Sequence, residues 1–302
     1  MTDAALPGIA FIGVGRMGLP IVRLLLKAGY PVAVCDPDAA QRALARASGA
    51  REAASVAECV RAADLIFSSL PDDSALREVA LGEEGVLQHA STQAVFAETS
   101  TVSPGLSAQI AEAAGRRGLA YLRLPLSGNS QSAQTGQLTA FVSGPAQAWS
   151  RVKPAVGSFT VAQLYLGEGE QARYMKLVIN LVVANTATLL AEALALGARS
   201  GLEWQAMLDA LAASTISSPW LRAKVERLQA HDFTPTMTPA QFSKDLALML
   251  QAGDALGVPM PMTATTRQLM KAVIAEGYGE QDFIAVVKLV ARLAGVSAGE
   301  PQ

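Results

Sequence analysis

The sequence predicts an α/β fold, with a doubly wound, mostly parallel sheet in the first part of the chain and an all-helical second part. Strand-like and helix-like runs alternate up to about residue 167, as they do in successive βαβ units. From Gln171 onward only helical periodicity remains, so we expect one domain over 1–167 and a second over 168–302. Helix-stopping residues interrupt this second part at Gly201, Ser217-Ser218-Pro219, Thr234–Pro239, Gly257–Pro261 and Gly277–Gly279.

A glycine-rich turn joins the first strand-like run, Ile9–Ile12, to a helical pattern. Gly13 would allow the tight turn out of the strand, Gly15 would let the backbone approach a pyrophosphate, and Gly18 would let the helix pack close to the sheet. The start of that helix offers unpaired N–H groups and a positive dipole end to phosphates. An ordinary glycine-rich turn is the alternative, and the flanking strands and a following acid decide against it.

The second strand-like run, Val32–Cys35, ends at Asp36. A carboxylate at this place can accept hydrogen bonds from both hydroxyls of a ribose, which completes the pattern of a dinucleotide-binding unit. The same carboxylate would repel the additional phosphate of NADP, and we expect Arg42 on the next helix to face solvent. The sequence therefore favours NAD over NADP.

The remaining strands are expected to extend this sheet, and ligands of such sheets bind at the carboxyl ends of the strands. Leu70-Pro71-Asp72 and Glu98-Thr99-Ser100-Thr101 both lie at such ends, and the hydroxyl of Thr101 is available to a cofactor. Alternatively, both segments only cap the helices that follow them. The expected helices lie around Ala54–Ala62, Asp73–Val79 and Ser103–Arg117, and the expected strands around Leu65–Leu70, Ala94–Glu98, Ala120–Pro125, Leu138–Ser143 and Val161–Leu166.

Composition excludes several classes of function. The chain has 302 residues, a net charge of −2 and no basic run, which argues against a nucleic-acid partner. Its two cysteines, Cys35 and Cys59, suit a reducing, cytoplasmic environment rather than a disulfide framework. His89 and His231 have no spacing that resembles a metal site. The first apolar run is the first strand, so we expect no signal peptide.

The segment Leu177–Ala191 is uncharged but shorter than the roughly 20 residues that a membrane span needs, and it contains Asn180 and Asn185. We therefore expect a helix buried on all sides rather than a membrane segment. Together with the apolar faces at Leu246–Leu250 and Ile284–Val290, it presents more apolar surface than one small domain can bury. The sequence thus predicts a homodimer or a tetramer.

Lys176 lies at the start of the apolar helical run Tyr174–Leu196 and shares a face with Asn180. A lysine in such a helix is costly to bury unless it faces a cleft or a partner. Partial burial would lower its pKa towards the range where it exchanges a proton near neutrality. The alternative is a lysine whose stem lies along an apolar surface at a helix end. Lys244-Asp245, taken alone, indicates a solvated face with a local charge pair.

The segment from Leu124 to Ser130 is rich in small polar residues and follows a predicted strand. Its backbone N–H groups and the Ser127 hydroxyl can bind a carboxylate. In isolation the same segment is also typical of a flexible turn.

Five segments make a resemblance specific, in this order: FIGVGRMGLP, ETSTVSP, LPLSGNSQSAQTGQLTAFVSG, YMKLVIN and FSKDLALML. They resemble, over nearly the whole chain, the β-hydroxyacid dehydrogenase family, which includes 3-hydroxyisobutyrate dehydrogenase and tartronate semialdehyde reductase. The resemblance implies a Rossmann domain, a long connecting helix and a helical second domain like that of 6-phosphogluconate dehydrogenase, in a homo-oligomer.

By position, the resemblance makes Lys176 the catalytic acid/base and Asn180 a residue that orients the lysine or the substrate. It places Ser127, Gly128 and Asn129 on the substrate carboxylate, and Lys244 beside both the nicotinamide and the substrate. The cofactor-binding residues that it implies are Gly13, Val14, Gly15, Arg16, Met17, Gly18, Asp36, Leu70, Pro71, Thr101 and Lys244.

The chain departs from the usual family loop, Asp-Ala-Pro-Val-Ser-Gly-Gly, at three positions. Arg123 replaces an acid, Asn129 replaces a glycine, and Ser132 stands where the family usually has glycine. The implied activity is NAD-dependent hydride transfer to or from a small β-hydroxy acid, similar to 3-hydroxyisobutyrate, with a semialdehyde or β-keto acid as the product. The three changes leave the substrate open. A semialdehyde or imine reductase, or a catalytically silent dinucleotide-binding scaffold, are the alternatives.

Overall fold

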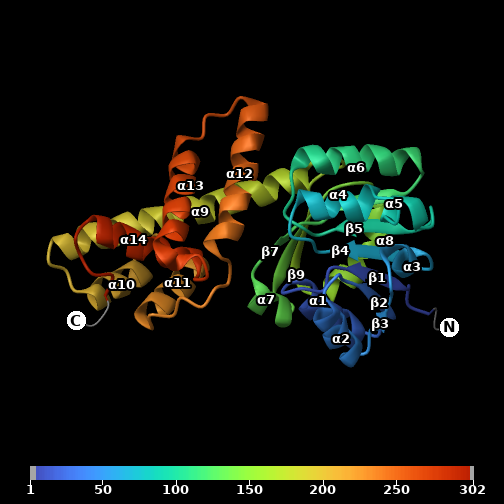
Figure 1. The fold of residues 1–302 in the computed structure, drawn as a ribbon, viewed down its shortest axis with the longest axis horizontal. Coiled ribbons are helices and arrows are strands. Elements are labelled where there is room, and N and C mark those ends of the chain that lie inside the picture. Colours follow the sequence, from blue (N-terminus) through green and yellow to red (C-terminus); the bar gives the residue numbers. More distant parts are fainter. Residues whose placement is uncertain (1–4, 300–302) are drawn as a thin grey trace. The chain divides into compact units, whose positions relative to one another are not determined.

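The computed structural model describes residues 5–299. Its internal contacts divide the chain into two compact units, the first ending at Lys176 and the second starting at Leu177 (Figure 1). The domain boundary predicted at residue 167 stays a prediction.

The first unit contains a six-stranded parallel sheet with the order β3-β2-β1-β4-β5-β6. The strand order reverses beside β1, which pairs with β2 on one side and with β4 on the other, so that Ile12 aligns with both Cys35 and Ser68. This reversal confirms the predicted doubly wound sheet and is the place where such sheets bind ligands. The strands are β1 (Ile9–Ile12), β2 (Val32–Cys35), β3 (Arg51–Glu52), β4 (Leu65–Ser68), β5 (Val95–Glu98) and β6 (Ala120–Arg123).

Helices cover both faces of this sheet, because alternate residues of its buried strands point in opposite directions. Phe11 and Phe67 pack on one face against α1 (Gly18–Lys27), α2 (Ala39–Ala47) and α8 (Ala146–Gly157). Ile66 and Phe96 pack on the other face. The helices there are α3 (Val56–Val60), α4 (Asp73–Leu81), α5 (Val86–His89) and α6 (Pro104–Arg116).

The expectation that the last two strands, around Leu138–Ser143 and Val161–Leu166, extend the parallel sheet was wrong. They form β8 (Leu138–Val142) and β9 (Thr160–Tyr165), which build a separate three-stranded sheet with β7 (Leu126–Ser127). β7 pairs with β8 in the antiparallel direction, since only a short segment with helix α7 (Ser130–Gln134) joins them and a parallel pair needs a longer crossover.

The second unit is helical, as predicted, and its helices end at the predicted breaks. The helices are α9 (Gln171–Arg199), which starts in the first unit, α10 (Trp204–Ala213), α11 (Pro219–Gln229), α12 (Pro239–Leu256), α13 (Pro261–Val273), a π-helical turn (Ile274–Tyr278), a 3-10 turn (Phe283–Ala285) and α14 (Val286–Leu293). Ser218 caps the start of α11. Thr238 and Gln241 form a capping box at the start of α12, and Gly257 in the left-handed conformation ends it.

Helix α9 is long and apolar enough to cross a membrane by length and composition, a test that core helices also pass. Ala184, Ala187 and Ala191 lie on its buried face, in the core of the second unit. The prediction that it is buried on all sides was wrong, because a stripe of apolar side chains remains exposed along it. We call these residues the α9 stripe: Val178, Val182, Leu189 and Leu196.

Candidate active site

The glycine turn after β1 has the geometry expected of each of its glycines. Gly13 has a φ of 86°, and a Cβ there would collide with the carbonyl oxygen of Ser69. A Cβ on Gly18 would collide with the carbonyl oxygen of Gly13, so α1 can only approach the turn with glycine at this position. At Gly15, within the described residues, a Cβ would meet nothing within 4 Å. The backbone at Gly15 is therefore open to a ligand.

The start of α1 differs from those of its neighbours. Asp38, Ser55 and Asp72 accept backbone hydrogen bonds at the starts of α2, α3 and α4. The side chain of Met17, the N-cap of α1, makes no such bond, and the first turn carries no acid. An anion can take the place of such a cap, so the turn fits the pyrophosphate of a dinucleotide.

Asp36 is held at the end of β2 by the turn that it faces. Its Oδ2 atom accepts a 2.8 Å hydrogen bond from the N–H of Val14, and its Oδ1 atom accepts one from the N–H of Asp38. Arg42 does not face solvent as expected: it donates to the Asp36 carbonyl oxygen at 2.7 Å and to Glu52 Oε1 at 2.8 Å. The guanidinium is thus already engaged by the protein.

The segments after β4 and β5 are joined at the same edge of the sheet. The N–H of Leu70 donates to Ser100 Oγ at 2.7 Å. Capping, the alternative function of these segments, is performed by Asp72 for α4 and by Ser103 for α6. Because Ser103 is the N-cap of α6, Thr101 is not; its side chain is partly exposed.

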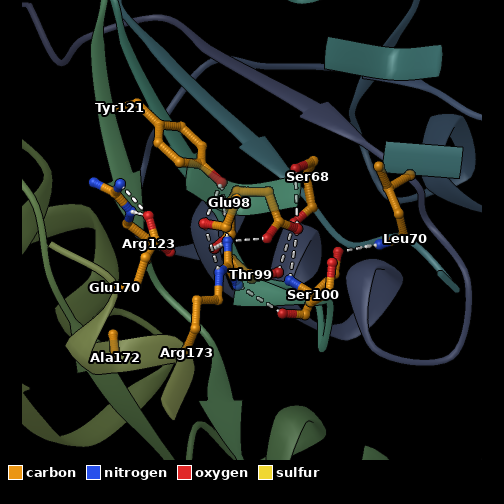
Figure 2. Close-up of polar contacts among 12 residues, drawn as sticks. Ser68, Leu70, Glu98, Thr99, Ser100, Tyr121, Arg123, Glu170, Ala172 and Arg173 are labelled. Atoms are coloured by element: carbon orange, nitrogen blue, oxygen red, sulfur yellow. Dashed lines mark hydrogen bonds and ion pairs between the residues drawn. The ribbon is translucent and has the colours of Figure 1, made fainter. Parts of the chain in front are cut away.

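A buried ion pair that sequence reasoning did not single out lies at the end of β5. Glu98 is fully buried and pairs with Arg173 of α9 (Figure 2). Burial by itself lowers the pKa of Arg173, but the Glu98 carboxylate and then Tyr121 raise it by more. The net pKa lies above the usual arginine value, so the guanidinium stays charged. A charged residue directly before the apolar run Tyr174–Leu196, three positions from Lys176, was the available signal.

The predicted substrate loop is held by a short strand and a short helix rather than being a free turn. Ser127 is in β7, and Gly128 follows with a φ of 132°. Asn129 caps α7, its Oδ1 accepting from the backbone N–H of Ser132 at 2.9 Å and from the Ser132 hydroxyl at 3.3 Å. Two of the three departures from the family loop are therefore partners of each other.

The third departure is also balanced within the first unit. Arg123 donates from Nε to Glu170 Oε1 at 2.8 Å, and its guanidinium lies 5.1 Å from the ring centre of Tyr121. Both Arg123 and Glu170 are largely buried. The basic residue at this position thus finds its counter-charge in the segment that precedes α9.

Lys176 is buried on α9, with 8% of its surface exposed. The helix begins at Gln171, earlier than the expected Tyr174, so Lys176 lies in its second turn. Asn180 is one turn further on the same helix and is also buried. Residues four apart on a helix share a face, so the lysine and the amide project in one direction.

In the second unit, Asp245 of α12 links two of the predicted site residues. Asn180 donates from Nδ2 to Asp245 Oδ2 at 2.9 Å, and Lys244 Nζ lies 3.2 Å from Asp245 Oδ1. Asp245 is only 2% exposed, so the interpretation of this pair as a solvated face was wrong for the aspartate. Sequence reasoning treated Asn180 and Lys244 separately, because they are far apart in the chain.

Comparison with known families decides the class of protein. Residues 8–167 match the family model described as the NAD binding domain of 6-phosphogluconate dehydrogenase. Residues 170–290 match the family model described as NAD-binding of NADP-dependent 3-hydroxyisobutyrate dehydrogenase. The chain belongs to the β-hydroxyacid dehydrogenase family.

Individual relatives of this β-hydroxyacid dehydrogenase match along nearly its whole length. The 2-(hydroxymethyl)glutarate dehydrogenase of Eubacterium barkeri is 32% identical over 295 residues, 97% of this chain and 98% of the relative. The NAD-dependent L-serine dehydrogenase of Pseudomonas aeruginosa is 31% identical over 288 residues, 93% and 97% of the two chains. The structure of Mycobacterium tuberculosis 3-hydroxyisobutyrate dehydrogenase with L-serine has a TM-score of 0.85 at 26% identity, covering 94% and 99%. The protein is thus an NAD(P)-dependent enzyme that acts on a CH–OH group.

A third buried ion pair, between Lys224 and Asp282, lies in the second unit. Lys224 lies 2.6 Å from Asp282, and both side chains are buried. Burial lowers the pKa of Lys224, and the Asp282 carboxylate acts in the opposite direction. Asp282 also accepts from the N–H of Thr236 at 3.0 Å, in the segment that leads into α12. The pair therefore fixes the entry to the helix that carries Lys244.

The glycine turn gives a prediction with two separable outcomes. Gly18→Ala should lower the free energy of unfolding by about 1–3 kcal/mol or more, because the new methyl group overpacks the contact between α1 and the turn. Gly15→Ala should leave the thermal midpoint close to wild type and weaken NAD(P) binding, because its methyl group enters only the space that a pyrophosphate needs. Thermal unfolding and NADH fluorescence titration measure the two effects. Equal loss of stability in both variants would contradict the assignment.

Proposed function

We propose that the protein is an NAD-dependent dehydrogenase of a small β-hydroxy acid, similar to 3-hydroxyisobutyrate, which it oxidises reversibly to a semialdehyde or β-keto acid. The observation that carries the proposal is Lys176, a buried lysine on the same helix face as Asn180. Such a lysine has the chemistry of a general acid/base, in a chain whose glycine turn and Asp36 fit a dinucleotide.

In this mechanism Lys176 takes the proton of the substrate hydroxyl during oxidation and returns it during reduction. The bound nicotinamide supplies the acceptor or donor of the hydride. Asn180, fixed by Asp245, orients the substrate or the lysine. Ser127 and the N–H groups of Gly128 and Asn129 bind the substrate carboxylate. Lys244 adds a positive charge for the carboxylate and the cofactor.

The names of the relatives support this class of substrate. Serine and 2-(hydroxymethyl)glutarate, on which two of them act by name, both carry a hydroxymethyl group on the carbon next to a carboxylate. Both are therefore β-hydroxy acids. A panel of 3-hydroxy acids that includes serine, followed by NADH absorbance, tests the proposal. Tight NAD binding without turnover of any member would instead favour a silent scaffold.

The preference for NAD rests on Asp36 and Arg42. The Asp36 carboxylate lies where the ribose of the cofactor is expected, and Arg42 is engaged by Glu52 and by the Asp36 carbonyl oxygen. The additional phosphate of NADP would lie next to the negative charge of Asp36, while the Arg42 guanidinium is already bound by other groups. Electrostatic repulsion therefore disfavours NADP.

Asp36→Ala should weaken NAD binding roughly tenfold to a hundredfold, the value of a lost hydrogen bond to a charged group, and reduce the discrimination against NADP. Asp64→Ala is the matched control, since Asp64 accepts from Gly8 before the start of the parallel strands, away from their carboxyl ends. Dissociation constants for both cofactors provide the measurement. A wild-type enzyme that prefers NADP would refute the assignment.

Lys176→Ala should lower kcat by ~10²–10⁴-fold through the loss of proton transfer, with NADH affinity nearly unchanged. If Lys176 also helps to bind the substrate carboxylate, the substitution would raise KM as well. Lys153→Ala, on the exposed face of α8, is the control for loss of a lysine. A stable Lys176→Ala enzyme with near wild-type kcat would show that another residue transfers the proton, and Lys244 would be tested next.

We also infer that the enzyme self-associates as a dimer or tetramer through the α9 stripe, because contiguous exposed apolar side chains mark interaction surfaces. Val182→Glu with Leu189→Glu should lower the molar mass measured by light scattering at micromolar concentration. Leu44→Glu, at an exposed leucine of α2, should leave it unchanged. A wild-type mass equal to one chain would disprove self-association.

A further inference from the structure

All three nitrogens of the Arg173 guanidinium donate within the first unit, although the side chain is 1% exposed. Nε donates to Ser107 Oγ at 3.2 Å, and Nη1 donates to the Ser100 carbonyl oxygen at 2.8 Å. Nη2 donates to the hydroxyl of Tyr121 at 3.1 Å and pairs with the carboxylate of Glu98. Figure 2 shows three of these partners, Glu98, Ser100 and Tyr121, around the Arg173 side chain. The guanidinium therefore fixes both the place and the rotation of the first turn of α9.

Stability alone does not account for this pair. A buried ion pair loses much of its Coulomb energy to desolvation, and well-packed apolar residues often replace it without loss. The directional bonds of Arg173 add geometric specificity instead. Their partners lie at the end of β5, on β6 and on α6, beside the predicted cofactor segments.

Ser100 connects Arg173 to those segments. Its N–H donates to Glu98 Oε1 at 2.7 Å, its carbonyl accepts from Arg173, and its hydroxyl accepts from the N–H of Leu70 at 2.7 Å. Thr101 is the next residue in the chain. A continuous set of hydrogen bonds thus joins the segments after β4 and β5 to α9, three residues before Lys176.

We propose that Arg173 and Glu98 are positioning residues, which couple the predicted cofactor-binding segments at Leu70–Pro71 and Thr101 to the first turn of α9, directly before the turn with Lys176. Through this coupling, a cofactor that orders Leu70 and Thr101 also holds Lys176 in place. The expected effect on turnover rests on the proposed function, whereas the effect of the cofactor on α9 does not.

The test compares two double variants, Glu98→Gln/Arg173→Met and Arg123→Met/Glu170→Gln. Each variant removes one buried arginine–glutamate pair of the first unit and leaves no lone charge. Of the two arginines, Arg173 is the one that donates to Ser100. For each enzyme we would measure kcat, the dissociation constant of NADH, the thermal midpoint, and amide hydrogen exchange of residues 171–180 with and without NAD.

For the Glu98/Arg173 variant, kcat should fall roughly tenfold to a hundredfold, the cost of a slightly misplaced catalytic group. NADH affinity should change much less, and NAD should no longer slow exchange in residues 171–180. The Arg123/Glu170 variant should keep the slowing by NAD, because neither of its residues contacts Ser100. Equal loss of this slowing in the two variants, or a lower thermal midpoint of the Glu98/Arg173 variant with unchanged kcat and unchanged slowing by NAD, would overturn the proposal.

Arg173→Lys covers the case in which the double variant does not fold. It keeps the charge beside Glu98 but cannot donate to Glu98, Ser100 and Ser107 together, because an ammonium lacks the planar fork. Its kcat and its slowing of exchange by NAD should both fall, and wild-type values of both would overturn the proposal. Failure of the wild-type enzyme to oxidise any β-hydroxy acid would refute the proposed function alone, since the exchange measurement still decides the coupling.

Discussion

The parallel pairing of β1 with its two neighbours is the constraint on which the first unit depends. Because Ile12 aligns with Cys35 on one side and with Ser68 on the other, the chain leaves all three strands at one edge of the sheet. Gly13, Asp36 and the segment that contains Leu70 are therefore neighbours without any direct sequence relation. A register shift of one residue in β1 would turn the side chains of that strand to the opposite face of the sheet and move Gly13 away from these neighbours.

Much of the fold could be predicted from local sequence, because glycine, proline and capping residues act on the backbone next to them. The turn at Gly13 and the helix ends at Ser218 and Gly257 are examples. The separate sheet of β7, β8 and β9 could not be predicted, since the sequence of a strand does not show which other strand it pairs with. The exposed stripe on α9 was missed for a similar reason: an apolar run does not show which of its faces finds a partner.

The candidate site follows the same division. Single residues with distinctive chemistry, such as Lys176 and Asp36, could be proposed as site residues from their type and position. The residues that hold them in place could not be predicted, because each of these contacts joins distant parts of the chain. Arg173 and Glu98 are 75 residues apart, and Asn180 and Asp245 are 65 apart. An aspartate or an arginine in an apolar helix signals a partner, but only the folded chain shows which one.

Two hydrogen bonds join Asn129 and Ser132 in the predicted substrate loop, so a mutation at one of these positions affects the other. Glycine at position 129 alone would remove the acceptor of two donors, and glycine at position 132 alone would remove one donor and loosen the backbone of α7. The two positions are thus expected to change together as the family diverges. If this predicted loop sets the substrate range, its exchange between relatives is expected to need both residues together, with the start of α7 in which Ser132 lies.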